Sequence, residues 1–215
     1  MDNVILSFII GYLLGSFPTA YILLKKNKGI DITQNGSGNV GAFNSYKVSE
    51  SKFLGISVLV VDVFKGLAAV LLISIFIGER FDLMTVGLVA AVLAHCYSPW
   101  IKFKGGRGLA TAAGGALILS IPVLVIWGVI WIIAYLFRRN IHFGNFTATL
   151  LTLLIVLTSS DILIKYTNPP AYSQLEFNVL VSLIFVTILS KHIEPIKEYF
   201  ISQNKKLRNQ KDESN

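Results

Sequence analysis

The sequence LATAAGGALILSIPVLVIWGVIWIIAYLF, residues 109–137, decides the fold of this chain. A helix needs about 20 apolar residues to cross the hydrocarbon core of a bilayer. This stretch of about 29 residues is too long for one untilted span and short for two. Pro122 disfavours helix in the residue before it, so a break is expected near Ser120-Ile121-Pro122. The charges in the flanking loops decide whether the stretch crosses once or twice.

The rest of the chain is also dominated by apolar blocks. Of its 215 residues, 53% are hydrophobic and only 14% are charged, with a mean hydropathy of +0.65. A soluble domain carries about 25% charged residues, so lipid is the expected solvent for most side chains here. Five further stretches are long or apolar enough to be spans: Val4–Leu24, Phe53–Ile77, Leu83–Trp100, Phe146–Ile164 and Glu176–Leu189.

Most of the 19 Lys and Arg residues fall into four clusters between these blocks, and cytoplasmic loops are enriched in such residues. All four clusters can be cytoplasmic only if two spans separate each from the next, so 109–137 is predicted to form two helices. The resulting fold is all-α, with seven transmembrane helices, the N-terminus outside and the C-terminus cytoplasmic. The clusters lie in 25–52, 101–107, 138–139 and 191–211.

Residues 1–200 are interpreted as a single transmembrane domain. The polar residues 201–215 are expected to form a disordered cytoplasmic tail. No Lys or Arg and no small-residue cleavage site accompany the first apolar stretch, so we read residues 4–24 as a span and not as a cleaved signal peptide.

Composition also excludes several classes of function. The net charge is +7, but the basic residues punctuate apolar blocks and form no continuous patch, which argues against nucleic-acid binding. The single cysteine, Cys96, rules out an intramolecular disulfide and a site of several thiolates. His95, His142 and His192 lack the spacing of metal ligands, so neither a metal nor another cofactor is predicted.

The first glycine-rich segment reads NGSGNVGAFN over residues 35–44. Its glycines let the backbone turn tightly and present N–H groups to an anion, and its Ser and Asn side chains add donors. A flexible linker is the alternative, although linkers seldom interleave Asn with Gly between two spans. The candidate phosphate ligands are Ser37, Gly38, Asn39, Gly41 and Asn44, together with the nearby Lys47.

The second glycine-rich segment reads FKGGRGLAT over residues 103–111 and should open a helix. Free backbone donors, a positive helix end and a guanidinium all favour a phosphate. The spacing is not that of a Walker A loop, and a loop that only sets membrane topology is the alternative. The candidate ligands are Lys104, Gly105, Gly106, Arg107 and Gly108.

Three further polar groups lie in or near predicted spans. Asp62 and Lys65 are three residues apart on one helical face and can partly neutralise each other. They form either a structural ion pair or, through Lys65, part of the anion site. His95 and His192 could act as general bases because imidazole titrates near neutral pH, although single histidines at an interface are more often structural.

In this order, these segments resemble the acyl-phosphate-dependent glycerol-3-phosphate acyltransferases of bacterial membranes. The resemblance covers residues 4 to about 197. It is carried by GSGNVGAFN at 36–44, DVFKG at 62–66, and His95 followed by FKGGRGLAT at 103–111, with GSFPTA at 15–20 resembling the opening of the family.

The resemblance implies a seven-span enzyme of the bacterial inner membrane with its active site facing the cytoplasm. It would move a fatty acyl group from acyl phosphate to the 1-hydroxyl of glycerol 3-phosphate, giving lysophosphatidic acid in phospholipid synthesis. No metal, nucleotide or other cofactor is implied, and its partners would be these two substrates and membrane lipid. The glycine loops would hold the two phosphates, and His95, His192 and Arg107 would be catalytic.

The sequence departs from the family pattern mainly at positions expected to hold the acceptor. Phe43 stands in place of Thr, Lys47 in place of Arg, and Arg107 in place of Lys. His142 lies where a Ser-rich stretch is usual, and Pro195 and Glu198 replace Asn and Arg after the last span.

These departures motivate a second hypothesis, a diverged member that uses another cytoplasmic acceptor or has lost activity. A small anion transporter is a third hypothesis, from a different class. Asp62 and Lys65 inside the membrane would suit it, but no internal repeat accompanies them.

Overall fold

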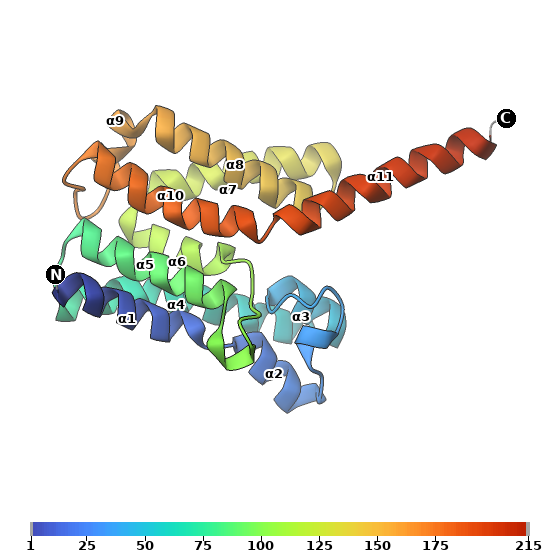
Figure 1. The fold of residues 1–215 in the computed structure, drawn as a ribbon, viewed down its shortest axis with the longest axis horizontal. Coiled ribbons are helices and arrows are strands. Elements are labelled where there is room, and N and C mark those ends of the chain that lie inside the picture. Colours follow the sequence, from blue (N-terminus) through green and yellow to red (C-terminus); the bar gives the residue numbers. More distant parts are fainter. Residues whose placement is uncertain (1, 214–215) are drawn as a thin grey trace.

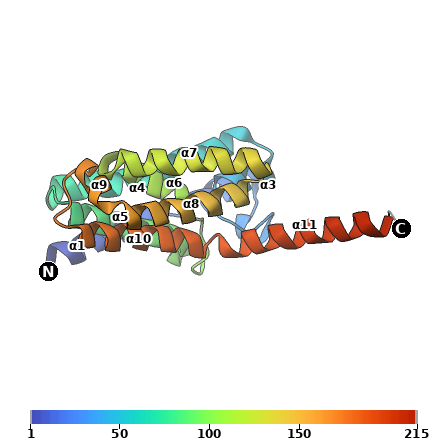
Figure 2. The same cartoon turned by 90° about the horizontal axis from the view of Figure 1, so that it is seen from above.

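A computed structural model describes residues 2–213 of the chain. Every regular element of this part is a helix, and the helices form an elongated bundle (Figures 1 and 2). The helices are α1 (Asp2–Ser16), α2 (Thr19–Lys28), α3 (Ala42–Ser49), α4 (Lys52–Phe76), α5 (Phe81–Cys96), α6 (Leu109–Leu119), α7 (Ile121–Arg138), α8 (Ile141–Thr158), α9 (Ser160–Leu163), α10 (Gln174–Ser190) and α11 (Ile193–Glu213). Three 3₁₀ turns, η1 (Ile32–Gln34), η2 (Pro99–Ile101) and η3 (Ile164–Tyr166), complete the set.

The predicted break in 109–137 is confirmed. Helix α6 ends at Leu119 and α7 begins at Ile121, with Pro122 in its first turn. Proline is tolerated there because the first N–H groups of a helix have no partner within the helix. A second break was not predicted. The first span is interrupted between α1 and α2 by Phe17 and Pro18.

The bundle is held by close pairs of helices. Helix α1 packs on α5, α4 on α6, α7 on α8, and α10 on both α5 and α8. The α4–α6 pair depends on glycine. A Cβ on Gly66 would overlap the backbone of Thr111, and one on Gly114 would overlap the backbone of Val63. This close approach fixes the start of α6, which carries the second glycine-rich segment.

By length and composition, five helical segments can cross a membrane, and six can if the bent pair α10 and α11 is counted as one span. The five are 2–28, 52–76, 81–101, 121–138 and 141–158. Helix α6 is apolar but has only 11 residues, or about 16 Å of helical rise, which is too short to cross alone. Seven spans therefore stay a prediction.

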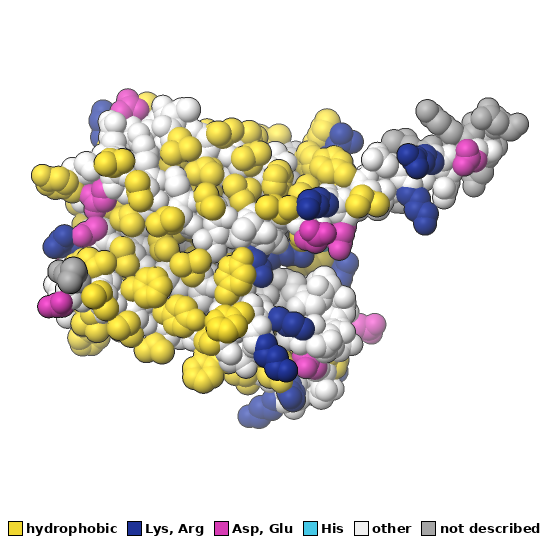
Figure 3. Space-filling model, in the orientation of Figure 1, with side chains coloured by type: hydrophobic (Ala, Val, Ile, Leu, Met, Phe, Trp, Pro, Cys, Tyr) yellow, Lys and Arg dark blue, Asp and Glu magenta, His cyan; other side chains and the backbone are white. Residues whose placement is uncertain are grey.

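The surface of the bundle has a large apolar region and a smaller basic region. Hydrophobic side chains cover most of the face shown in Figure 3, whereas Lys and Arg gather where α2, α3 and α11 lie. The start of α1 and the end of α11 lie at opposite ends of the long axis (Figure 1). The bundle therefore has an apolar body, as lipid requires, and one basic end.

The polar C-terminal residues up to Glu213 continue α11, which extends away from the bundle (Figure 1). The segment is rich in Lys and Gln, which have high helix propensity, so the local sequence favours the helix without tertiary contacts. The division into a domain of residues 1–200 and a disordered tail stays a prediction. Residues 214 and 215 of the predicted tail lie outside the described part.

Candidate active site

A cavity of about 500 Å³ lies at the basic end of the bundle. It is lined by the first glycine segment, by the starts of α3, α6 and α8, and by the end of α5. Nine of the predicted site residues come together in it: Ser37, Asn39, Gly41, Asn44, Lys47, His95, Arg107, Gly108 and His192.

Asn44 shapes the first glycine segment instead of reaching toward a ligand. Its side chain is buried, and its Nδ2 donates to the carbonyl oxygens of Asn35 and Asn39 at 3.1 and 3.0 Å. Its Oδ1 accepts from the backbone N–H of Ser37 at 3.1 Å. Gly36 lies at φ +61°, and a Cβ there would overlap Oδ1 of Asn44. Because both donors of Asn44 are used within the loop, its predicted role as a phosphate donor becomes one of holding the loop.

Two helices begin at the cavity without a side-chain cap. Helix α3 starts after Gly41 and α6 starts after Gly108, and neither N-cap residue accepts a hydrogen bond through a side chain. The first residues of both helices line the cavity. Uncapped N–H groups and the positive end of the helix dipole make such a terminus a site for anions. The predicted helix start at the second glycine segment is confirmed, and the cavity has two such ends.

The second glycine segment packs tightly against His95. The backbone N–H of Gly106 donates to the carbonyl oxygen of His95 at 3.0 Å, and a Cβ on Gly106 would overlap the imidazole. The carbonyl of Gly105 accepts from the N–H of Val40 at 3.1 Å, which joins the two glycine segments. Gly105 and Gly106 therefore hold His95 and the loops in place and do not line the cavity.

The buried charges of α4 form a chain beneath the cavity. Nζ of Lys65 donates to Asp62 at 2.7 Å and to the carbonyl oxygen of Phe17, at the α1–α2 break, at 2.6 Å. Nδ1 of His95 lies 3.8 Å from the same Asp62 oxygen. Asp62 lines the cavity and Lys65 does not. Lys65 therefore donates to the Phe17 carbonyl at the helix break, which also accepts from the N–H of Thr19, and compensates the charge of Asp62, as the structural interpretation of this pair predicts.

Arg107 is the most buried cation of the cavity that no carboxylate pairs directly. Its Nη1 lies 3.0 Å from Nδ1 of His142. Because arginine can only donate, His142 must accept through an unprotonated Nδ1. Burial lowers the pKa of Arg107, and the carboxylate of Glu198 opposes that shift. Guanidinium stays protonated in proteins, so the cavity holds a poorly solvated positive charge that a phosphate can compensate.

His192 is fully buried and its tautomer is fixed by its partners. Nδ1 lies 2.8 Å from the carbonyl oxygen of Ile188, which can only accept, so Nδ1 carries the proton. Nε2 is then an acceptor, and it lies 3.4 Å from Nδ2 of Asn145. Trp131 orients Asn145 by donating to its Oδ1 at 2.7 Å. His192 thus offers an unprotonated nitrogen at the cavity.

The start of α8 and the middle of α7 contribute His142, Asn145 and Trp127 to the lining. His142 was expected only as a departure from the family pattern, and Asn145 and Trp127 were not predicted. His142 and Asn145 are three residues apart at the start of an apolar helix, and this spacing puts them on one face. That pattern was available as a signal. The predicted site residues that do not line the cavity are Gly38, Lys65, Lys104, Gly105 and Gly106.

Within residues 2–213, no group of three or more His, Cys, Asp or Glu side chains is arranged to hold a metal ion. The functional groups that the cavity offers are backbone N–H groups, two cations, imidazoles, Ser and Asn side chains, and the carboxylate of Asp62, which Lys65 compensates. They suit anion binding and proton movement at phosphate and hydroxyl groups.

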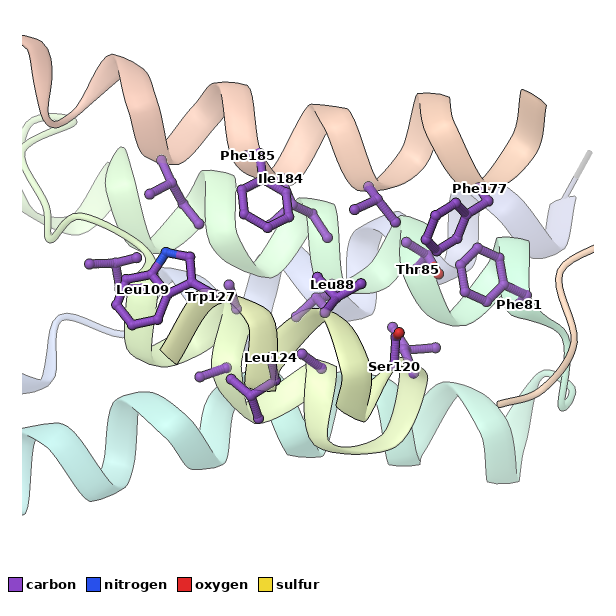
Figure 4. Close-up of a pocket in the computed structure, with 17 residues that line it drawn as sticks. Phe81, Thr85, Leu88, Leu109, Ser120, Leu124, Trp127, Phe177, Ile184 and Phe185 are labelled. Atoms are coloured by element: carbon purple, nitrogen blue, oxygen red, sulfur yellow. The ribbon is translucent and has the colours of Figure 1, made fainter. Parts of the chain in front are cut away.

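An apolar groove adjoins the polar cavity and shares Leu109, Ala113 and Trp127 with it. It runs between α5, α6, α7 and α10 toward the opposite end of the bundle (Figure 4). The site thus combines a polar chamber for anions with an apolar slot.

Comparison with known proteins agrees with this chemistry. The family model described as glycerol-3-phosphate acyltransferase matches residues 5–201. A glycerol-3-phosphate acyltransferase of Helicobacter acinonychis (strain Sheeba) is 33% identical over 221 residues, covering 95% of this chain and 94% of that protein. Glycerol-3-phosphate acyltransferase 2 of Moorella thermoacetica is 37% identical over 154 residues, covering 71% of this chain and 77% of that protein.

Solved structures give the same result. The crystal structure of PlsY (YgiH), described as an integral membrane glycerol 3-phosphate acyltransferase in its glycerol 3-phosphate form, aligns with a TM-score of 0.77. It is 28% identical to this chain, with 93% of this chain and 92% of that one covered. The lysophosphatidic acid form aligns with a TM-score of 0.74. The expected family is confirmed, and the chain belongs to the glycerol-3-phosphate acyltransferases of the integral membrane type.

Proposed function

We propose that this protein transfers a fatty acyl group from acyl phosphate to the 1-hydroxyl of glycerol 3-phosphate, releasing lysophosphatidic acid and inorganic phosphate. One observation carries the proposal: two uncapped helix N-termini, those of α3 and α6, meet at one cavity, and each has a cation close to it. Two phosphate-bearing substrates require two such sets of donors. Lys47 accompanies the first set and Arg107 the second.

The chemistry follows from what the cavity offers. The glycerol hydroxyl attacks the acyl carbonyl carbon and forms the ester bond, while the bond from that carbon to the phosphate oxygen breaks. The proton of the hydroxyl passes to a phosphate oxygen, with His95 and His192 orienting the groups or relaying the proton. Arg107 and the N–H groups of α6 stabilise the charge that develops on the carbonyl oxygen and the leaving phosphate. Positioning both substrates supplies much of the remaining rate enhancement.

Three of the proposed phosphate ligands have weaker structural support. Lys65 is held by Asp62 and Phe17, so we assign it to the scaffold of the cavity. Lys104 is exposed outside the cavity and Gly38 does not line it. Lys104 would act through long-range attraction of anionic substrates, which is screened by salt.

The first experiment is acyl transfer by the purified protein in detergent, with palmitoyl phosphate and labelled glycerol 3-phosphate. Labelled lysophosphatidic acid should form without added metal, and palmitoyl-coenzyme A should not replace palmitoyl phosphate. Product formed only from the coenzyme A thioester would overturn the donor assignment. Absence of product with either donor, from protein with a cooperative melting transition, would overturn the reaction.

A second candidate is transfer to a different acceptor, because four departures from the family pattern line the cavity itself: Phe43, Lys47, Arg107 and His142. Nζ of Lys47 lies 4.9 Å from the centre of the Phe43 ring, so the cation already has a partner. Release of phosphate from palmitoyl phosphate without lysophosphatidic acid would favour this candidate. Acceptors with a hydroxyl beside a phosphate would then be screened by mass spectrometry of the acylated product.

We further propose seven spans in the bacterial inner membrane, with the N-terminus outside and the cavity and C-terminus in the cytoplasm. Support comes from the basic end of the bundle and from the positive-inside rule. The only cysteine is buried, so single introduced cysteines can be labelled without background. Ser202→Cys should resist an impermeant maleimide in intact cells and react in inverted vesicles, and Tyr172→Cys should do the reverse.

A further inference from the structure

The apolar groove follows the helices over a defined length. Along α6 it extends from Leu109 to Leu119, ten residues or about 15 Å of helical rise. Along α10 it extends from Ile188 to Phe177, a similar distance. The small side chains of α6, Ala112, Ala113 and Ala116, leave the space that forms the slot. The slot is about 90 Å³ in volume, so an entering chain must push side chains apart.

The far end of the groove is closed by two aromatic rings. Phe81, at the start of α5, and Phe177, near the start of α10, are buried with ring centroids 6.0 Å apart (Figure 4). Both rings lie at the end away from Leu109 and Trp127, where the groove meets the polar cavity (Figure 4). A chain that enters from the cavity therefore meets the ring pair last.

Two hydroxyl groups add a polar element to this closed end. Thr85 and Ser120 are buried and line the groove, and neither hydroxyl has a hydrogen-bond partner among the described residues. Figure 4 draws both near the ring pair. Both hydroxyl oxygens are already shielded from water, and a methyl terminus that reached them would supply no hydrogen bond, so it gains less there than in a wholly apolar pocket. Sterics and polarity therefore both stop a chain at the same depth.

We infer that the Phe81–Phe177 pair, with Thr85 and Ser120, sets the length of acyl chain that this protein accepts. The inference rests on the proposed function, since the fatty acyl chain in the groove would be that of the acyl donor. An extended chain advances about 1.25 Å per carbon, given C–C bonds of about 1.5 Å. The groove of about 15 Å thus holds about 12 carbons. With the first carbons lying in the polar cavity, the preferred chain has about 14–16 carbons, and longer chains are disfavoured.

The test compares acyl phosphates of 12 to 20 carbons on the wild type and on variants of the closed end. Each additional methylene that becomes buried improves kcat/KM about fourfold. Removing the Phe177 ring should let about two more methylenes be buried, so Phe177→Ala should raise the ratio of kcat/KM for the 18-carbon over the 14-carbon donor by more than tenfold. Ala116→Leu, which fills the slot midway, should shift the preference toward shorter chains by a similar factor. The opposite signs of the two shifts separate a length limit from general damage.

The test includes a control variant outside the groove and a milder variant of Phe177. Phe76→Ala removes a ring that is 75% exposed at the end of α4 and does not line the groove, so it should leave the chain-length profile unchanged. Truncating a buried Phe destabilises a protein strongly, so Phe177→Leu is the alternative if the alanine variant does not fold. It should move the profile in the same direction by a smaller factor.

A binding experiment separates failure of this inference from failure of the proposed reaction. Monoalkyl phosphates of 12 to 20 carbons cannot transfer an acyl group, and their binding raises the melting temperature of the protein in lipid nanodiscs. Stabilisation should peak near 14–16 carbons in the wild type and move to longer chains in Phe177→Ala, whether or not turnover occurs. An unmoved profile in both variants, by binding and by turnover, would overturn the length limit while leaving the reaction intact.

Discussion

The polar cavity and the apolar groove meet at Leu109, Ala113 and Trp127, but they are built in different ways. The cavity is made of loops and helix ends, and hydrogen bonds fix its shape. The groove is lined by apolar side chains along α5, α6, α7 and α10, and packing fixes most of its shape. Loss of a single polar contact should therefore disrupt the shape of the cavity. A change in side-chain size should alter the volume of the groove only gradually.

The difference follows from the energetics of the two environments. A buried polar group without its partner costs about 1–3 kcal/mol, and more if it is charged. Asn44 and Lys65 are held by short, specific contacts for that reason. Apolar side chains in the groove lose only contact area when a neighbour shrinks, so selectivity there is graded by volume. Substrate chemistry is thus decided in the cavity and substrate size in the groove.

The largest effect is expected from breaking the ion pair under the cavity. Asp62→Asn leaves the charge of Lys65 buried without its carboxylate, and losing one partner of a buried pair costs about 3–5 kcal/mol. The melting temperature in detergent should fall strongly. Asp82→Asn, at a partly exposed pair with Arg80, is the control and should change it little. Equal melting temperatures for the two variants would contradict a stabilising role for the buried pair.

The next effect concerns charge in the cavity. Arg107→Ala removes the guanidinium proposed to stabilise the transition state, and loss of one such group costs about 10²–10³-fold in kcat. Acyl transfer kinetics should show this loss, while membrane insertion and melting remain near those of the wild type. Arg80→Ala, an exposed arginine near the far end, should keep full activity. Normal kinetics for Arg107→Ala would refute its role.

A smaller effect should follow from moving His95 without changing it. A Cβ on Gly106 would overlap the imidazole, so Gly106→Ala should displace His95 and lower kcat about 10–100-fold. Gly128→Ala in α7 is the matched control, since a Cβ there meets no atom within 4 Å. It should keep activity and gain slightly in stability. If both alanine variants were equally active, His95 would not need its observed position.

The smallest effect is expected where cavity and groove join. Nε1 of Trp127 donates to Thr149 at 3.1 Å, and Trp127→Phe removes this hydrogen bond while keeping an aromatic ring. A neutral hydrogen bond contributes about 0.5–1.5 kcal/mol, so KM for the acyl donor should rise less than about tenfold. Chain-length preference should stay unchanged, because the closed end is intact. A shift in preferred length would place the length limit at the junction instead.

The sequence by itself determined most of the apolar helices, the family and nine of the residues that line the cavity. Length and hydropathy identify the apolar helices because lipid requires every backbone group to be satisfied within a helix. Local rules placed the break at Ser120 and the helix start after Gly108, since Pro and Gly act on their immediate neighbours. The glycine segments predict anion binding because glycine acts locally too: it lets the adjacent backbone turn and present N–H groups.

Only the tertiary structure decided which of these residues share a cavity. It turned Lys65 and Asn44 inward to hold the scaffold, and it brought His142 and Asn145 of α8 beside Arg107 and His192. It also created the groove, whose lining comes from α5, α6, α7 and α10. Hydropathy gives the same value to a residue facing lipid and one facing a slot, so the groove emerges only when packed helices leave a space between them.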